Sequence, residues 1–200
     1  MPRAVLLSGS DPDLEPSTRI EHAQISIREV DDVYDEGTRD RILDLIATRP
    51  RPLERTERPG HLTGSALVVD HRARRMLLML HAKLGIWVQP GGHADGDANL
   101  AAVALREATE ETGIAGLRVW PRAVDLDVHE VDPPGEDAHE HHDVRYLVVA
   151  PPDAVEQGNH ESRELRWVET DELADLGVDT GMYRLARRGL ALAARLGIVE

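Results

Sequence analysis

Residues 91–114 read GGHADGDANLAAVALREATEETGI and place three glutamates, Glu107, Glu110 and Glu111, in the last turns of a predicted helix. Gly113 ends this helix, because glycine readily adopts the left-handed conformation that follows many helices. The glutamates therefore lie near the negative end of the helix dipole, which costs about 0.3–1 kcal/mol per exposed charge. A bound cation is the simplest compensation for this cost.

The helix presents these carboxylates on its apolar side. At about 100° per residue the three glutamates fall within an arc of roughly 100°, which also carries Leu100, Val103 and Ala104. A solvated charged face would lie opposite this stripe, so the carboxylates are expected to point inward. Asp97 or Asn99 caps the helix start. A glycine-rich loop followed by inward carboxylates suits Mg²⁺ or Mn²⁺ bound to phosphate oxygens.

The stretch resembles the Nudix box, a family motif with the pattern glycine, five residues, Glu, seven residues, then Arg-Glu-apolar-x-Glu-Glu-x-Gly-apolar. The matching residues, in register, are Gly92, Arg106, Glu107, Ala108, Glu110, Glu111, Gly113 and Ile114. The pattern's first glutamate falls on Ala98. In the family that glutamate lies near the box arginine and is not the main metal ligand. Its absence therefore bears on the placement of Arg106, and Asp95 or Asp97 is a candidate substitute.

The resemblance implies an α/β/α sandwich with a mixed sheet and an Mg²⁺-dependent, or Mn²⁺-dependent, hydrolase. The substrate implied is a small nucleotide, a nucleoside diphosphate linked to another group, whose diphosphate linkage is cleaved. The implied metal ligands are the carbonyl of Gly91 or Gly92 and the side chains of Glu107, Glu110 and Glu111. Arg106 would orient a carboxylate, and a glutamate would take the proton of the attacking water.

A further glutamate is expected in the loop before Trp167. In the family, a glutamate six residues ahead of a strand tryptophan serves as an extra metal ligand or base, and Glu161 stands at this spacing. Two alternatives stay open: Glu161 is a solvated loop acid, or Glu164 in the same loop takes the role.

Three histidines, His139, His141 and His142, stand close together in the segment AHEHHDVRY. Imidazole is a common zinc ligand, and the first two would share one face of a strand. The sequence offers no cysteine and no compact H-x3-H pair to complete a closed site. We therefore favour a polar strand entrance whose histidines bond to the glycine loop or line the substrate cleft.

Other residues near the box are candidates for substrate binding. His93, which follows Gly91 and Gly92, contacts a substrate phosphate or holds the loop. Arg145 clamps a phosphate with its planar guanidinium or pairs with one of the many acids. Trp87 stacks on a base or belongs to the core, and the core is the commoner place for a strand tryptophan.

Composition limits the partners. The chain has 37 acidic and 23 basic residues and a net charge of -14, which argues against long nucleic acids and membrane surfaces. It has no cysteine, which excludes disulfides and thiol nucleophiles. Without an apolar run of the ~18 residues that span a bilayer, or a signal sequence, the expected location is the cytoplasm.

The 200 residues divide into an N-terminal extension, residues 1–58, and a compact domain, residues 59–200. The extension is polar and partly helical, and the sequence leaves open whether it forms a homodimer contact, a lid or a loose arm. Expected strands are 65–69, 76–80, 86–88, 117–131 (as one or two strands), 145–149 and 165–168. Expected helices are 38–47, 98–112 and 181–196, with a capping signal at 170.

Other functions compete with nucleotide hydrolysis. Isopentenyl diphosphate isomerases share the Nudix fold, but their catalytic cysteine has no counterpart here. A ligand-sensing module without catalysis is the main alternative, although such modules commonly lose box glutamates that this chain keeps. An RNA 5′-end pyrophosphohydrolase is disfavoured by the acidic balance and the lack of a basic patch.

Overall fold

The computed structural model describes residues 5–30, 36–133 and 135–198. The strands are β1 (Leu7–Ser8), β2 (Gly60–Val69), β3 (Met76–His81), β4 (Trp87–Val88), β5 (Gly91–His93), β6 (Arg118–Val131), β7 (His139–Val149) and β8 (Ser162–Val168). The helices are α1 (Ile20–Arg28), α2 (Glu36–Thr48), α3 (Leu100–Thr112) and α4 (Thr180–Arg195), with short 3-10 turns at Pro12–Leu14 and Thr170–Ala174.

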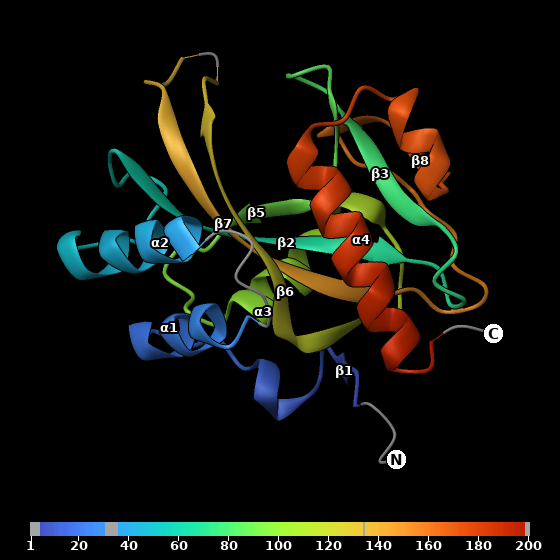
Figure 1. The fold of residues 1–200 in the computed structure, drawn as a ribbon, viewed down its shortest axis with the longest axis horizontal. Coiled ribbons are helices and arrows are strands. Elements are labelled where there is room, and N and C mark those ends of the chain that lie inside the picture. Colours follow the sequence, from blue (N-terminus) through green and yellow to red (C-terminus); the bar gives the residue numbers. More distant parts are fainter. Residues whose placement is uncertain (1–4, 31–35, 134, 199–200) are drawn as a thin grey trace.

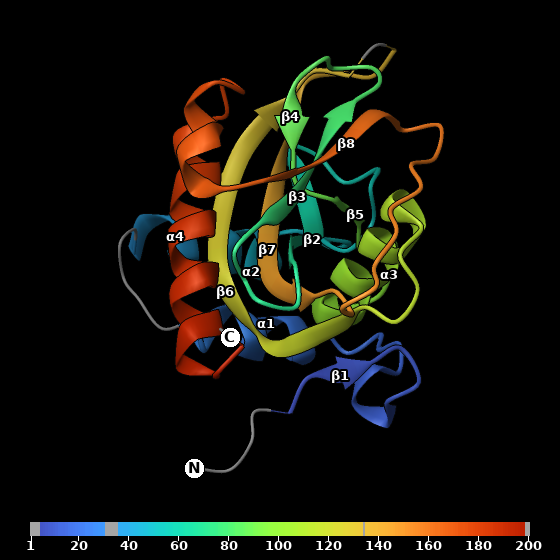
Figure 2. The same ribbon diagram turned by 90° about the vertical axis from the view of Figure 1, so that its right-hand side faces the viewer.

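A mixed sheet forms the middle layer (Figure 1). Its strand order is β1-β6-β7-β2-β3-β4, with β5 added to β2 and β8 added to β3. Strands β2 and β7 run parallel and the other pairs are antiparallel. Figure 2 shows α3 and α4 on opposite sides of the sheet. The predicted α/β/α sandwich with a mixed sheet is confirmed.

Alternating side chains of the central strands supply both cores. Ala66 and Val68 of β2 belong to the apolar cluster on the α3 side, whereas Leu67 and Val69 belong to the cluster on the α4 side. The same alternation runs along β7. Strands buried on both faces read as nearly continuous apolar runs, which is why these segments were recognisable in the sequence.

The helix of the glycine-rich stretch is present and ends as predicted. It begins at Leu100 because the Asn99 side chain accepts a hydrogen bond from the Ala102 N–H, and it ends at Gly113, whose φ is 65°. The three glutamates do not share one environment, however. Glu111 is buried, Glu107 is half-buried and Glu110 is exposed. Only Glu111 therefore lies completely within the apolar stripe.

The N-terminal extension packs on the same core as the rest of the chain. Ile27 of α1 and Ile42 of α2 are fully buried in the cluster that contains Leu100 of α3. Helix α2 covers the predicted helix 38–47, and α1 was not predicted. The described part of the extension is therefore a packed layer, while its boundary at residue 58 remains a prediction.

The extension is held at the start of α3 by Asn99. This side chain donates to the backbone carbonyls of Asp13 (3.0 Å) and Glu15 (3.1 Å). Close by, the Asp97 carboxylate accepts from the Ser17 N–H (2.9 Å). Asn99 thus joins a helix cap to a contact between distant segments.

Replacing Asn99 with alanine is expected to lower the free energy of unfolding by about 2–4 kcal/mol, because a cap and two further buried hydrogen bonds are lost. The matched control is Asp179→Ala, which removes the cap of α4, a hydrogen bond from the Met182 N–H (2.8 Å). This control should cost only about 1 kcal/mol. Urea unfolding followed by circular dichroism measures both, and equal losses would mean that the contacts with the extension contribute nothing.

Candidate functional site

The glycine loop and the second half of α3 bring two carboxylates against the backbone. The Gly91 N–H donates to Glu111 Oε2 over 2.9 Å. A Cβ atom at Gly92 would overlap the carboxylate of Glu107, so only glycine lets this side chain lie against the loop. The loop therefore fixes the positions of Glu107 and Glu111 from one side.

Arg106 holds Glu107 from the other side, although the first box glutamate is replaced by Ala98. Its guanidinium donates to Glu107 Oε1 (3.0 Å) and approaches the His93 carbonyl (3.4 Å). Neither candidate substitute for the missing acid bonds to Arg106. Asp95 pairs with Arg55, and the Asp97 carboxylate accepts from two backbone N–H groups.

Ala98 is fully buried beneath the N-terminal extension, and its N–H donates to the Ser17 carbonyl over 2.5 Å. The backbone of the extension thus reaches the position that carries a glutamate in the family pattern. Arg106 keeps its contact with Glu107 in this arrangement.

Glu161 lies beside Glu111, and its role as an extra metal ligand or base stays a prediction. Burial, and then a hydrogen bond between the Glu111 and Glu161 carboxyl groups, raises the pKa of Glu111 to about 9, against the opposing effect of the Gly91 N–H. The Glu111 carboxyl group therefore holds a proton at neutral pH, in its hydrogen bond with Glu161. The rival Glu164 is turned away and pairs with Arg166 on β8 (2.7 Å).

Four acids gather here, Glu107, Glu110, Glu111 and Glu161, which we call the carboxylate cluster. Burial raises the pKa of Glu107 against the effect of Arg106, and the charges of Glu110 and Glu161 raise it further. Among the described residues, the basic side chains within 4.0 Å of the cluster are Arg106, beside Glu107 (3.0 Å), and His160, beside Glu161 (3.7 Å). A divalent cation with oxygen ligands would balance the remaining charge and displace the proton on Glu111.

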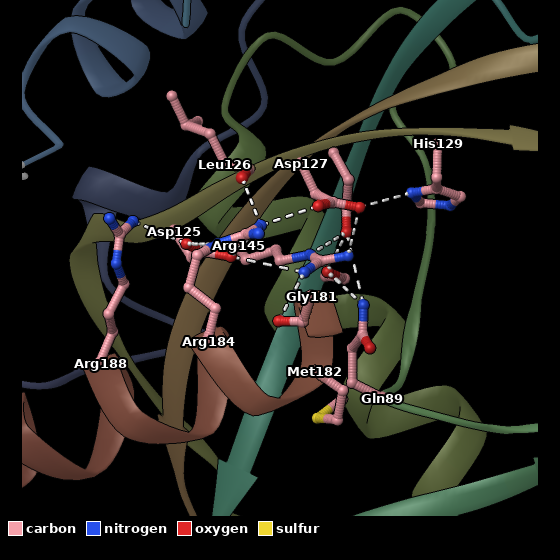
Figure 3. A network of polar contacts seen from close by, with 12 residues as sticks. Gln89, Asp125, Leu126, Asp127, His129, Arg145, Gly181, Met182, Arg184 and Arg188 are labelled. Atoms are coloured by element: carbon pink, nitrogen blue, oxygen red, sulfur yellow. Dashed lines mark hydrogen bonds and ion pairs between the residues drawn. The ribbon is translucent and has the colours of Figure 1, made fainter. Parts of the chain in front are cut away.

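Arg145 lies in a buried ion-pair network (Figure 3). Its guanidinium donates to the carboxylates of Asp143 (2.8 Å), Asp127 (3.0 Å) and Asp125 (3.4 Å) and to the Gly181 carbonyl (3.3 Å). The residue is only 3% exposed. These contacts favour pairing with acids over the phosphate clamp for this candidate substrate-binding residue.

Helix α4 completes this network. Arg184 bonds to Asp125 and Asp127, and Arg188 bonds to Asp125 (2.7 Å). Burial acts to raise the pKa of Asp127, but the His129 hydrogen bond and the Arg145 and Arg184 charges hold it well below its usual value. These partners could not be identified from the sequence, because they are far apart along the chain.

Because successive side chains of β7 point to opposite faces of the sheet, the three histidines of this segment divide into two groups. His139 and His141 lie near His61, with ring centroids 5.0 Å from it, whereas His142 points to the other face and pairs with Glu140 (3.1 Å). The His93 ring joins the first group, 5.0 Å from His61. His61, the second residue of β2, was missed because it lies before the predicted start of this strand at 65 and far from the other histidines in sequence.

Trp87 belongs to the core on the α4 side. Its ring is partly buried there, and the Arg166 guanidinium lies 4.9 Å from the ring centroid. The core placement, one of the two alternatives for this residue, therefore agrees with the structure. No helix among the described residues is both long and apolar enough to cross a membrane.

Comparison with known proteins gives a consistent assignment. The family model described as the NUDIX domain matches residues 61–188. A Mycobacterium tuberculosis protein named "Putative 8-oxo-dGTP diphosphatase 3", found in two strains, is 38% identical over 122 residues, covering 58% of this chain and 50% of the relative. The chain thus spans about half the length of the curated relatives it matches.

Solved structures share the fold. RenU, a Nudix hydrolase from M. smegmatis, is 27% identical to this chain, with a TM-score of 0.51. The match covers 68% of this chain and 88% of RenU. A C. elegans Ap4A hydrolase in a binary complex is 21% identical to this chain, with a TM-score of 0.54. The match covers 67% of this chain and 98% of the hydrolase. The second likeness concerns the fold alone.

Proposed function

This chain belongs to the NUDIX domain family, and on this basis we propose that it hydrolyses the diphosphate linkage of a small nucleotide in an Mg²⁺-dependent reaction. The observation that carries the proposal is that two carboxylates lie against the same backbone segment: the Gly91 N–H donates to Glu111 Oε2 over 2.9 Å, and the Glu107 carboxylate lies against Gly92. Partly buried carboxylates gathered in one place are unfavourable for folding unless a function requires them, and a bound cation would supply that function.

The donor set of the carboxylate cluster fits Mg²⁺. Glu107, Glu110 and Glu111 offer carboxylate oxygens, and the Gly92 carbonyl is the backbone candidate, with Glu161 as a further ligand or base. Hard oxygen ligands of this kind suit Mg²⁺, with Mn²⁺ as a substitute. When bound, the ion would neutralise charge on the phosphates and lower the pKa of a bound water.

The chain's own residues would position and deprotonate the attacking water. Arg106 keeps Glu107 in place through its hydrogen bond, and the Gly91 N–H does the same for Glu111. Glu110 and Glu161 are the exposed carboxylates of the cluster, and Glu161, whose side chain is 46% exposed and comes from the loop before Trp167, is the preferred base. The attack on phosphorus would then proceed in line with the leaving group.

The substrate class we propose is nucleoside triphosphates and related small nucleotides. The name of the M. tuberculosis relative supports a nucleoside triphosphate, and that of the C. elegans neighbour refers to a dinucleoside polyphosphate. The net charge of -14 supports a small ligand held locally by a metal ion over a long polyanion. His93 and the glycine loop remain candidates for contact with the phosphates.

A substrate screen tests this proposal. Purified protein is incubated with 8-oxo-dGTP, unmodified nucleoside triphosphates, dinucleoside polyphosphates, nucleotide sugars and capped RNA, with Mg²⁺ or with EDTA. We expect Mg²⁺-dependent cleavage of at least one small nucleotide, detected by chromatography of the products, and no cleavage with EDTA. Salt should have little effect, since steep loss of activity with salt is typical of long nucleic acids.

Inactivity toward every class, with Mg²⁺ and with Mn²⁺, would contradict the enzymatic proposal and favour the ligand-sensing alternative. Cleavage of capped RNA alone would contradict the assigned substrate class. Cleavage that persists in EDTA would contradict the role of the carboxylate cluster.

A further inference from the structure

A second group of titratable side chains lies on the sheet face opposite α3. Between β2 and β7, His61 is paired with His141. The next pair on the same face of the sheet is Thr63 and Asp143. Further along, Leu67 lies on the α4 side. The paired histidines thus continue the α4 face of the sheet beyond the Arg145 network.

Two further strands contribute histidines to this face. His93 of β5 is paired with Thr63, and His129 of β6 is paired with His141. Directly paired residues point to the same side of a sheet. His93 therefore lies on the α4 face, whereas its neighbour Gly92 contacts Glu107 on the α3 face.

Three of these imidazoles lie close enough together to surround an ion. One ligand nitrogen each of His61, His139 and His141 can be chosen so that all lie within 4.8 Å of one another. A tetrahedral zinc site with Zn–N bonds of about 2.0–2.1 Å needs nitrogens roughly 3.3 Å apart. The nitrogens are thus at most about 1.5 Å too far apart for such a site. Among the described residues, these three histidines are the group of histidine or acidic side chains whose ligand atoms all lie within 4.8 Å of one another.

The nitrogens of this trio lack ordinary partners. Both ring nitrogens of His61 and Nε2 of His141 are buried without a hydrogen bond, although the Glu57 carbonyl is near enough to affect the pKa of His61. A buried polar nitrogen without a hydrogen-bond partner is unfavourable in the folded state. In contrast, His139 Nδ1 lies 2.8 Å from the Asp137 carbonyl. As a donor it leaves Nε2 as the free ligand nitrogen, a common arrangement at metal-binding histidines.

The trio is also held in the form that binds metals. Burial first, and then the neighbouring histidines, lowers the pKa of His61 to about 4 and that of His141 to about 2. Both rings are therefore neutral at physiological pH, and neutral imidazole is the ligand form.

We propose that His61, His139 and His141 form a binding site for a transition-metal ion of the Zn²⁺ class, with His93 as the nearest additional imidazole. Three imidazole ligands suit Zn²⁺ and related d-block ions, whereas Mg²⁺ requires oxygen ligands. The site is separate from the carboxylate cluster because β2 and β5 lie between the two faces. The site joins β2 to β7. Whether it binds Zn²⁺ can be tested independently of the proposed hydrolysis.

Zinc binding to the full-length protein tests the site. Metal is removed by dialysis against EDTA, the EDTA is removed, and Zn²⁺ is titrated by calorimetry with excess Mg²⁺ present to occupy the carboxylate cluster. We expect one high-affinity Zn²⁺ per chain. His139→Gln and His141→Gln should each weaken this binding at least about tenfold, since even loss of an outer-sphere partner has effects of this size.

Two controls separate the site from other sources of binding. His71→Gln, in the exposed turn after β2, and Glu111→Gln, in the carboxylate cluster, should leave Zn²⁺ affinity unchanged. Co²⁺ provides a spectroscopic readout, because four-coordinate Co²⁺ with nitrogen ligands absorbs more strongly than octahedral Co²⁺ with oxygen ligands.

Unchanged Zn²⁺ affinity in both histidine variants, with circular dichroism spectra like the wild type, would overturn the proposal. Absence of Zn²⁺ binding by the wild-type protein would do the same. Loss of binding in Glu111→Gln, but not in the histidine variants, would place the ion at the carboxylate cluster.

Discussion

The Glu111→Gln variant is expected to lose at least about 100-fold in Mg²⁺-dependent turnover while its metal-free form becomes more stable than the wild type. Glutamine keeps an oxygen that can accept from the Gly91 N–H, and its amide N–H can replace the proton shared with Glu161. It removes the charge that a cation requires. A loss of activity with a gain in stability separates a functional carboxylate from a structural one.

The stability gain should depend on pH. The pKa of Glu111 is raised from its ordinary 4.5 to about 9 in the folded state, so between these values the folded protein binds more protons than the unfolded chain. Stability from this group is complete below pH 4.5 and falls as pH rises toward 9. Each pKa unit corresponds to about 1.4 kcal/mol, so the loss should exceed about 1 kcal/mol. Glutamine, which does not titrate, should remove this decline.

Thermal unfolding in EDTA between pH 6 and pH 8.5, together with turnover in Mg²⁺, measures both effects. The matched control is Glu164→Gln, an exposed acid on β8 paired with Arg166, which should match the wild type in activity and in pH dependence. Near-normal turnover in Glu111→Gln, or a pH slope identical to the wild type, would contradict the assigned role of Glu111.

Replacing Arg145 with methionine is expected to lower the free energy of unfolding by about 3–5 kcal/mol, because buried aspartates lose their central cation. Asp143 is affected most, since its other recorded partners are neutral: the hydroxyls of Thr63 and Ser65 and the Gln89 amide. A neutral side chain leaves this carboxylate buried without a counterion nearby.

Urea unfolding and substrate kinetics together distinguish the two roles considered for Arg145. Pairing predicts a large loss of stability with an unchanged KM, whereas a phosphate clamp predicts a raised KM with little change in stability. Arg41→Met is the control, since the Arg41 pair with Glu140 is 2.7 Å long but largely exposed. An exposed pair contributes about 0–1 kcal/mol. Equal stability losses in the two variants would contradict the network's importance.

The fold was predictable where the chain signals its structure locally. Helix α3 carries its own cap at Asn99 and its own stop at Gly113, and apolar runs identified the inner halves of β2 and β7. The outer halves of these strands were missed: β2 begins at Gly60, against a predicted 65, and β7 at His139, against 145. Their residues are polar because they face other polar groups across the sheet, which only the strand register reveals.

The candidate site was predictable to a similar degree. The glycines and two of the glutamates of the box lie together in the structure, and Glu161, chosen by its spacing from Trp167, lies beside Glu111 of α3. Its role as a metal ligand or base stays a prediction. The environment of Arg145 and the proximity of His61 to His141 depend on pairings between strands that are distant in sequence. Side chains contributed by different strands leave no local pattern, so neither could be derived from spacing along the chain.

The most direct test of the central claim is calorimetric titration of metal-free protein with Mg²⁺ at pH 7, in two buffers that differ in ionisation enthalpy. If the carboxylate cluster holds the ion, the wild type should bind Mg²⁺ and release about one proton, because burial raises the pKa of Glu111 to about 9 and the cation displaces its proton. Glu111→Gln should bind more weakly and release none. Equal Mg²⁺ affinity and equal proton release in the two proteins would contradict the account.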